Sequence, residues 1–397
     1  MPLIRFLFSH GASSLALGVH LVLLAWLSVD SLALSSTEFA WVQTMALLPS
    51  IGLTLLSGVW VDKYGALPVL FVSQVLLTLA YGFLAWVLIS GGLSLETLLI
   101  YALWVGFGNG LMQPAREKLV TDVAALSLQK KISLASVIQF SMQSCGIALA
   151  ALSDSLGVST VVLIQVGIAF LGAANTFGLH LGHTVPNQSP SMLSHVASLS
   201  AGFRALFGHA ALRQLMVLIG FNGHMHMGVF IVLMPILATE SYQFTSAQYG
   251  GLQFVFVLGM ISAHLGLLRK STVQYPGQGA LFSLLYTAVI GYALTKSPTV
   301  TGLYVLVFCW GLVAGNSAAQ CRMVLQSLSA AELKGRLMSI YQFILFGAAP
   351  VGALTTGYFI RYLSMTEILY VMSLSSVGLF VLFMFSRSLW AVEQIES

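Results

Sequence analysis

The chain has 397 residues, of which 58% are hydrophobic and 7% are charged, and its formal net charge is +4. Soluble globular chains carry about 25% charged residues, so this composition excludes water as the main solvent of the fold. A bilayer is crossed by about 20 apolar residues, which leaves room for twelve spans and for no soluble domain of useful size.

Apolar runs separated by charged or turn residues predict two sets of six spans. The first run follows Arg5 directly and lacks a small-residue cleavage site, so we expect a retained first span rather than a signal peptide. The spans predicted in the first half are 7–29, 39–61, 67–90, 95–115, 132–152 and 158–180. Those predicted in the second half are 214–237, 247–268, 278–295, 299–320, 337–360 and 367–387.

This pattern predicts an all-α membrane protein with twelve transmembrane helices in two halves. The N-terminal six-helix half covers 1–181, a cytoplasmic linker covers 182–213, and the C-terminal six-helix half covers 214–397. The linker begins with prolines and serines and continues into a helical-looking segment at 200–209. It is interpreted either as an interfacial amphipathic helix or as a plain solvated connection.

The basic residues orient the predicted spans. With both termini in the cytoplasm, fourteen of the sixteen Lys and Arg residues fall on the cytoplasmic side and only Lys296 and Arg361 fall outside. The positive-inside rule demands this distribution, and a change of one in the number of spans would destroy it. We therefore expect a multi-pass protein of a bacterial cytoplasmic (inner) membrane with both termini in the cytoplasm.

Two sequence matches suggest that the halves are repeats. Residues 136–140 (SVIQF) match residues 339–343 (SIYQF) at an offset of 203, and His20 and His224 differ by 204. Parallel repeats of this kind are a known transporter architecture, with the substrate site near the membrane midplane. The two histidines are accordingly interpreted as symmetry mates.

The connection between the second and third spans carries a motif. Gly58, Asp62, Lys63 and Gly65 resemble the signature loop of the major facilitator superfamily, although Ala66 and Leu67 stand where that family usually has basic residues. A carboxylate at the C-terminal end of a helix faces the negative end of the helix dipole and needs a cationic partner. The resemblance implies that Asp62 acts as a conformational latch on the cytoplasmic side. A solvated loop that only sets topology is the alternative.

Further motifs resemble the enterobactin-exporter and macrolide-efflux branch of that family. They are 200–204 (SAGFR), 246–250 (SAQYG), 335–339 (GRLMS) and 113–116 (QPAR). Through them, Arg116, Gly335 and Arg336 join the expected latch. The resemblance implies proton-driven export of a siderophore, with multidrug or antibiotic efflux as the alternative and import less favoured.

Histidines and amides are the strongly polar side chains of the predicted span centres. In the family that the chain resembles, the first and seventh helices line the cavity, which makes His20, Asn222, His224 and His226 the leading candidates for substrate and proton coupling. Asn109 and Gln139 are the further candidates. Histidine has an ordinary pKa near 6.5 and can therefore couple proton entry to transport. A neutral histidine that is hydrogen-bonded between helices is the competing interpretation.

Other classes of function lack their sequence signals. The chain has no phosphate-binding Gly-x-x-x-x-Gly-Lys-Ser/Thr loop, so we expect an ion gradient as the energy source and no cofactor. His224 and His226 point about 200° apart on a helix, which argues against a metal site, and no cluster typical of an intramembrane enzyme is evident. The expected partners are a small-molecule substrate and the lipid bilayer, not nucleic acid. The chain is expected to act as a monomer, with any periplasmic or outer-membrane export partner left open.

Overall fold

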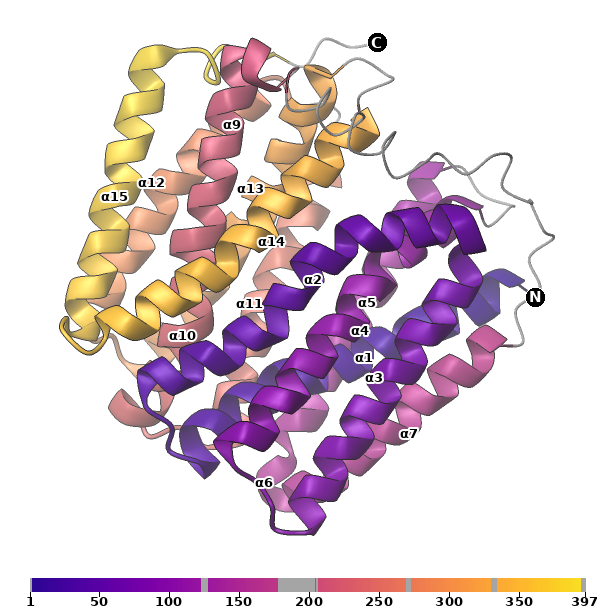
Figure 1. The fold of residues 1–397 in the computed structure, drawn as a ribbon. Helices are drawn as coiled ribbons and strands as arrows, with labels where there is room; N and C mark the ends of the chain where they lie inside the picture. The colour runs from indigo at the N-terminus through magenta and orange to yellow at the C-terminus, as the bar shows by residue number, and fades with distance from the viewer. Residues whose placement is uncertain are drawn as a thin grey trace. The chain divides into compact units, whose positions relative to one another are not determined.

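The computed structural model describes residues 2–122, 128–177, 204, 206–268, 273–329 and 334–393. These residues form helices joined by short turns (Figure 1). The first half contains α1 (Pro2–Trp26), η1 (Leu27–Ser31), α2 (Ser36–Tyr64), α3 (Ala66–Ile89), α4 (Leu95–Asp122), α5 (Leu128–Ala151), α6 (Ser153–Leu156) and α7 (Val158–Phe177). The second contains α9 (Ala210–Phe221), η2 (Asn222–Met227), α10 (Gly228–Ile236), η3 (Leu237–Ser241), α11 (Ser246–Leu268), α12 (Pro276–Leu294), α13 (Val300–Ser327), α14 (Lys334–Phe359) and α15 (Met365–Ser386).

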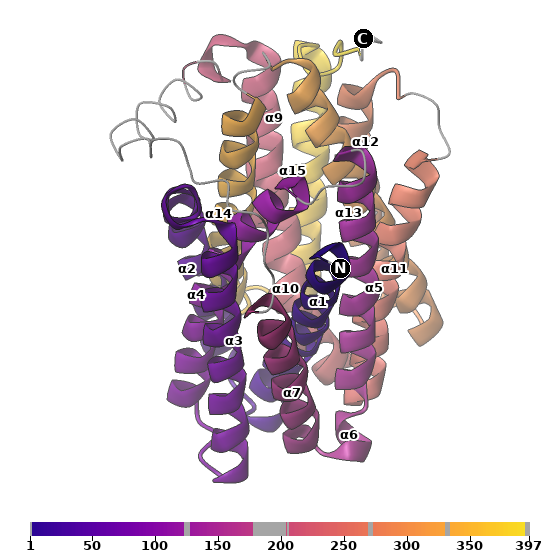
Figure 2. The same ribbon diagram turned by 90° about the vertical axis from the view of Figure 1, so that its right-hand side faces the viewer.

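Twelve of these segments match the twelve predicted spans. Among the described residues, ten segments are long and apolar enough to cross a membrane. Helix α2, with 29 residues, and α5, with 24 residues and an apolar stretch over Val137–Ala151, supply the remaining two. The seventh span consists of α9, η2, α10 and η3 in sequence, and Figure 2 shows α9 continuing into α10. Large apolar side chains such as Phe385 (78% exposed) cover the outside, as a lipid environment requires.

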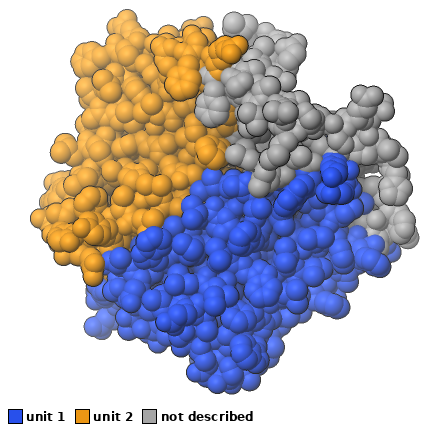
Figure 3. All heavy atoms as spheres, viewed as in Figure 1, with its two compact units in different colours: residues 1–192, 238–253 blue, residues 193–237, 254–397 orange. Residues whose placement is uncertain are grey.

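Most of the predicted linker, 182–203, lies outside the described residues. The described chain divides into two compact units, shown in different colours in Figure 3. Unit 1 comprises 1–192 and 238–253, and unit 2 comprises 193–237 and 254–397. The division falls inside α11, because its first two turns belong to unit 1 and the rest belongs to unit 2.

In unit 1, contacts at the N-terminus of α11 explain this division. The backbone N–H of Ser246 donates to Oδ2 of Asp154 (2.9 Å), and the Ser153 hydroxyl donates to the Ser246 hydroxyl (3.0 Å). A methyl group added at Gly250 would lie 2.6 Å from Cβ of Ala151. The short helix α6 thus caps the start of α11 and satisfies one of its free N–H groups.

The turns reveal an internal repeat more clearly than the sequence does. Both η1 and η3 are π-helical, and each is followed by a residue with positive φ, Ala33 (46°) and Gln243 (50°). The next helix begins in both cases with a reciprocal cap, from Ser35 to Glu38 and from Thr245 to Gln248. Ala33 and Gln243 are 210 residues apart, so the offset here is 210 and not the 203 that the sequence match predicts.

Close glycine contacts pack equivalent helices in each unit. In unit 1, a methyl group at Gly146 of α5 would lie 2.0 Å from the carbonyl oxygen of Leu15 in α1. In unit 2, a methyl group at Gly352 of α14 would lie 2.0 Å from the carbonyl oxygen of His224 in η2. Small residues permit such backbone approach in membranes, where lipid tails supply no hydrophobic force between helices.

Candidate functional site

The π-helical segment η2 holds three of the predicted polar residues and connects them to three helices of unit 2. The Asn222 amide donates to the Ser317 hydroxyl of α13 (3.3 Å), and His226 Nε2 lies 3.0 Å from the Ser376 hydroxyl of α15. His224 Nε2 lies 3.5 Å from the Thr355 hydroxyl of α14, which is a weak contact. A π-helix inside a longer helix often marks a functional site.

A hydrogen-bond chain continues from Asn222 into unit 2. Ser317 and Ser283 hydroxyls are 2.9 Å apart, and Ser283 donates to the carbonyl of Ala280 (2.6 Å). The Ser317 hydroxyl thus accepts from the Asn222 amide and lies within hydrogen-bond distance of the Ser283 hydroxyl. The side-chain oxygens of Asn222 and Gln320 are buried and have no hydrogen-bond partner among the described residues. The sequence interpretation missed this chain, because nothing in the spacing of Ser283 and Ser317 reveals that their helices meet.

His20 lies in unit 1 in a more enclosed place than His224. Its Nδ1 is 2.8 Å from the Tyr101 hydroxyl of α4, the rings meet edge to face at 5.4 Å, and the side chain is 3% exposed. His224 is half-buried. The two environments therefore differ in both access and partner.

The repeat register explains this difference between the histidines. At the offset of 210 that the turns define, His20 corresponds to Phe230. Phe230 meets Trp310 edge to face at 5.3 Å in unit 2, and Trp310 lies 209 residues after Tyr101. The His20–Tyr101 and Phe230–Trp310 pairs thus occupy equivalent slots between the first and fourth helices of their repeats. His20 and His224 are not symmetry mates, which corrects the interpretation drawn from their spacing of 204.

Asn109 and Gln139 lie near the middle of α4 and α5 in unit 1. Both side chains are half-buried. Neither amide forms a hydrogen bond with another residue of the described chain, whereas Gln165 of α7 donates to the Ala16 carbonyl (2.8 Å). An amide in contact with lipid alone costs several kcal/mol, so these two amides require a polar environment.

A second polar cluster, absent from the predictions, joins α1, α3 and α7. The Gln74 amide donates to the hydroxyls of Ser9 (2.6 Å) and Ser13 (2.9 Å), and the Thr176 hydroxyl donates to Oε1 of Gln74 (2.6 Å). All four side chains are buried. Because these side chains satisfy one another's hydrogen bonds, we assign the cluster to helix packing. The i, i+4 spacing of Ser9 and Ser13 was the sequence signal that could have indicated it.

The predicted latch is described only in part. The structure does not describe the surroundings of four latch residues, which are Gly58, Asp62, Gly335 and Arg336. Gly65, with φ of 87°, ends α2 and permits the turn into α3. Lys63 is exposed, with Nζ 4.9 Å from the Tyr64 ring centroid, and the buried Arg116 donates to Oε1 of Gln113 (2.6 Å). In the described part of the chain, no three His, Cys, Asp or Glu residues form a group that could hold a metal ion.

The family model described as Major Facilitator Superfamily matches residues 6–353. The nucleoside transporter NupG has a TM-score of 0.78 at 14% identity, covering 97% of this chain and 99% of its own. A D-xylose-proton symporter has a TM-score of 0.71 at 14% identity, covering 95% and 96%. The human organic anion transporter MFSD10 has a TM-score of 0.68 at 16% identity, covering 97% and 98%. A search of curated proteins gave no match. These likenesses, with the twelve spans, confirm the predicted fold class.

Proposed function

The chain belongs to the Major Facilitator Superfamily, and we propose that this multi-pass membrane transporter exports a small organic molecule in exchange for protons. A siderophore is the leading substrate, on the strength of the sequence motifs at 200–204, 246–250 and 335–339. The transporter works by alternating access in a bacterial inner membrane, with both termini in the cytoplasm. Asp62 and its neighbours form the cytoplasmic latch.

The proposal of a polar substrate path rests on the side-chain amides of Asn109 and Gln139. Asn109 lies within the span of α4 and Gln139 near the start of the apolar stretch of α5, and neither is hydrogen-bonded to another residue of the described chain. Interhelical hydrogen bonding is the usual role of such amides, and within the described residues these two make no such bond. They are available to a polar solute that enters the membrane region from an aqueous side.

Of the four leading candidates for substrate and proton coupling, His224 is the one we assign to the proton. No described Asp or Glu lies in the middle of a span, so histidine is the remaining group that changes charge near neutral pH. His20 and His226 are held at 2.8 and 3.0 Å by their partners, whereas His224 has one weak contact at 3.5 Å and is half-buried. Asn222 and His226 then position the segment that carries His224.

The deciding experiment measures small molecules in the cytoplasm and supernatant of wild-type and deletion strains, with and without iron. Accumulation of an iron chelator inside deletion cells supports siderophore export. Unchanged chelator together with raised sensitivity to antibiotics replaces it by multidrug efflux. Loss of uptake of a solute, with no change in either export, identifies an importer and overturns the proposed direction.

A further inference from the structure

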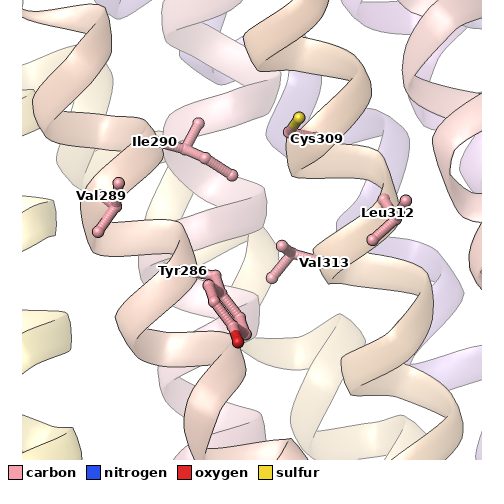
Figure 4. A pocket seen from close by; sticks show the side chains of 6 residues that line it. All are labelled: Tyr286, Val289, Ile290, Cys309, Leu312 and Val313. Carbon is pink, nitrogen blue, oxygen red and sulfur yellow. The ribbon is translucent and has the colours of Figure 1, made fainter.

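A side groove of unit 2 lies between α12 and α13. It has a volume of about 280 Å³ and is lined by Tyr286, Val289, Ile290, Cys309, Leu312 and Val313, three from each helix (Figure 4). Ile290 (6% exposed) and Val313 (9%) form its floor. Val289 (60%), Tyr286 (53%) and Leu312 (39%) stand at its open edge. The groove therefore opens sideways onto the apolar surface that the spans present to lipid.

Helix α12 carries a cation beside two tyrosines after its C-terminal end. Lys296 follows the C-terminal end of α12 and is exposed, and its Nζ lies 4.7 Å from the ring centroid of Tyr292. The Tyr292 ring is in turn 6.1 Å from that of Tyr370 in α15. Hydrogen bonding to the Tyr292 hydroxyl raises the pKa of Lys296 above its ordinary value, so the ammonium stays charged at neutral pH.

Helix α12 connects the groove to this cation. Val289 and Tyr292 are three residues apart in α12 and so share one face of the helix, and Lys296 lies two residues beyond its last residue, Leu294. This is the arrangement of a phospholipid, whose anionic phosphate lies at the membrane surface while its acyl chain runs inward along the apolar core. Tyrosines at the membrane surface bury an apolar ring and direct a hydroxyl to the head groups.

We propose that the groove between α12 and α13 binds one acyl chain of an anionic phospholipid, whose phosphate is held by Lys296 and the tyrosine hydroxyls beside it. In the proposed orientation this lipid belongs to the outer leaflet. The leaflet, but not the site, depends on that orientation.

A second groove of the same kind shows why the charge matters. It encloses about 200 Å³ between α2 and α4 in unit 1 and is lined by Trp41, Met45, Leu99, Ile100 and Leu103. The first turns of these helices carry Glu38 and Glu96. Carboxylates near its end repel an anionic head group, so this groove serves as an internal control for the one that ends at Lys296.

Cys309 provides the test, because its thiol lines the groove and is partly exposed. The full chain carrying Cys145→Ala is placed in phosphatidylcholine bilayers with or without phosphatidylglycerol and labelled with a lipophilic maleimide. Cys321 is 2% exposed and stays unreactive. At phosphatidylglycerol levels about twice the dissociation constant, labelling of Cys309 slows about threefold. Lys296→Gln removes this protection. Arg361→Gln causes the same loss of charge on a turn that does not line the groove, and it leaves the protection intact.

Two further arms separate the possible sources of protection. Ile100→Cys in a chain with Cys145→Ala and Cys309→Ala reports on the unit 1 groove and gains no protection from phosphatidylglycerol. Glycerol phosphate in solution, which has the head group without the chains, does not slow labelling of Cys309. Three results would each overturn the proposal. The first is equal labelling of Cys309 with and without phosphatidylglycerol, and the second is an equal effect of Lys296→Gln and Arg361→Gln on its protection. The third is full protection of Cys309 by glycerol phosphate. Thermal unfolding of each variant confirms that it is folded before labelling.

Discussion

His20 and Tyr101 form a polar pair in a slot that the other repeat fills with Phe230 and Trp310. The edge-to-face geometry is kept, at 5.4 and 5.3 Å, while the chemistry changes. Two apolar rings therefore suffice to pack such a slot. We infer that the fold requires a ring of this shape at position 20. The hydrogen bond of His20 is a feature of unit 1 alone.

A pair of substitutions separates shape from polarity at this slot. We expect Tyr101→Phe to lower the free energy of unfolding by about 1–3 kcal/mol, because it leaves the buried His20 nitrogen without its partner. His20→Phe combined with Tyr101→Phe removes both polar groups and recovers most of that loss. Thermal unfolding of the purified protein measures both. A double variant less stable than Tyr101→Phe would contradict the packing role.

His224 has the opposite character, with a weak contact and partial exposure. We expect His224→Gln to flatten the dependence of transport on pH between about 5 and 8, because glutamine keeps a polar side chain that does not titrate in that range. The matched control is His264→Gln, since His264 bonds to the Met260 carbonyl of its own helix. Counterflow in proteoliposomes at fixed pH values gives the profile. The same profile for wild type and both variants would exclude His224 as the coupling group.

At the scale of helices, glycine contacts set how closely η2 approaches α14. Gly352→Ala places a methyl group 2.0 Å from the His224 carbonyl oxygen, where the backbone must shift. We expect reduced expression or a lower unfolding midpoint, and reduced transport by any protein that folds. Gly266→Ala in α11 is the control, because its Cβ would meet no atom within 4 Å and alanine favours helix by about 1 kcal/mol. Equal stability of the two variants would show that this approach is not tight.

Helix boundaries were predictable from the sequence to within a few residues in most spans. Helix α13 covers Val300–Ser327 where 299–320 is predicted, and α4 covers Leu95–Asp122 where 95–115 is predicted. Both extensions contain an arginine, Arg116 in α4 and Arg322 in α13, which ends a window chosen for apolar residues although the helix continues. The π-helical segments were not predictable at all, because hydropathy carries no information on whether a backbone bond spans four or five residues.

For the molecule as a whole, composition and loop charges predicted the all-helical, twelve-span fold. The contacts of single polar residues were less accessible. Ser9 and Gln74 are 65 residues apart and Asn222 and Ser317 are 95 apart, and no local pattern indicates that such residues meet. The pairing of His20 with His224 failed for the same reason, since numerical spacing does not register small differences in length between the repeats.

Helix α11 belongs to both units and is capped by unit 1. Asp154→Ala removes the acceptor for the Ser246 N–H, so we expect a loss of about 1 kcal/mol in stability and faster amide hydrogen exchange in the first turn of α11. Asp154→Asn retains a side-chain acceptor and serves as the milder comparison. If amide hydrogen exchange at Ser246 and its neighbours is the same in Asp154→Ala as in the wild type, the cap does not stabilise this helix.

The π-helical turn at Asn222–Met227 makes the seventh span sensitive to length as well as to side-chain identity. A π-helical turn holds one residue more than the α-helical turn that it replaces, so a single deletion there would restore ordinary α-helical winding and leave the helix before it and the helix after it facing as they do now. Asn222 and His226 would keep the helix faces that contact Ser317 and Ser376, while the residues between them, among them His224, would turn to new positions. Relatives that lack one residue in this stretch are thus expected to differ in mechanism even where every polar side chain is kept.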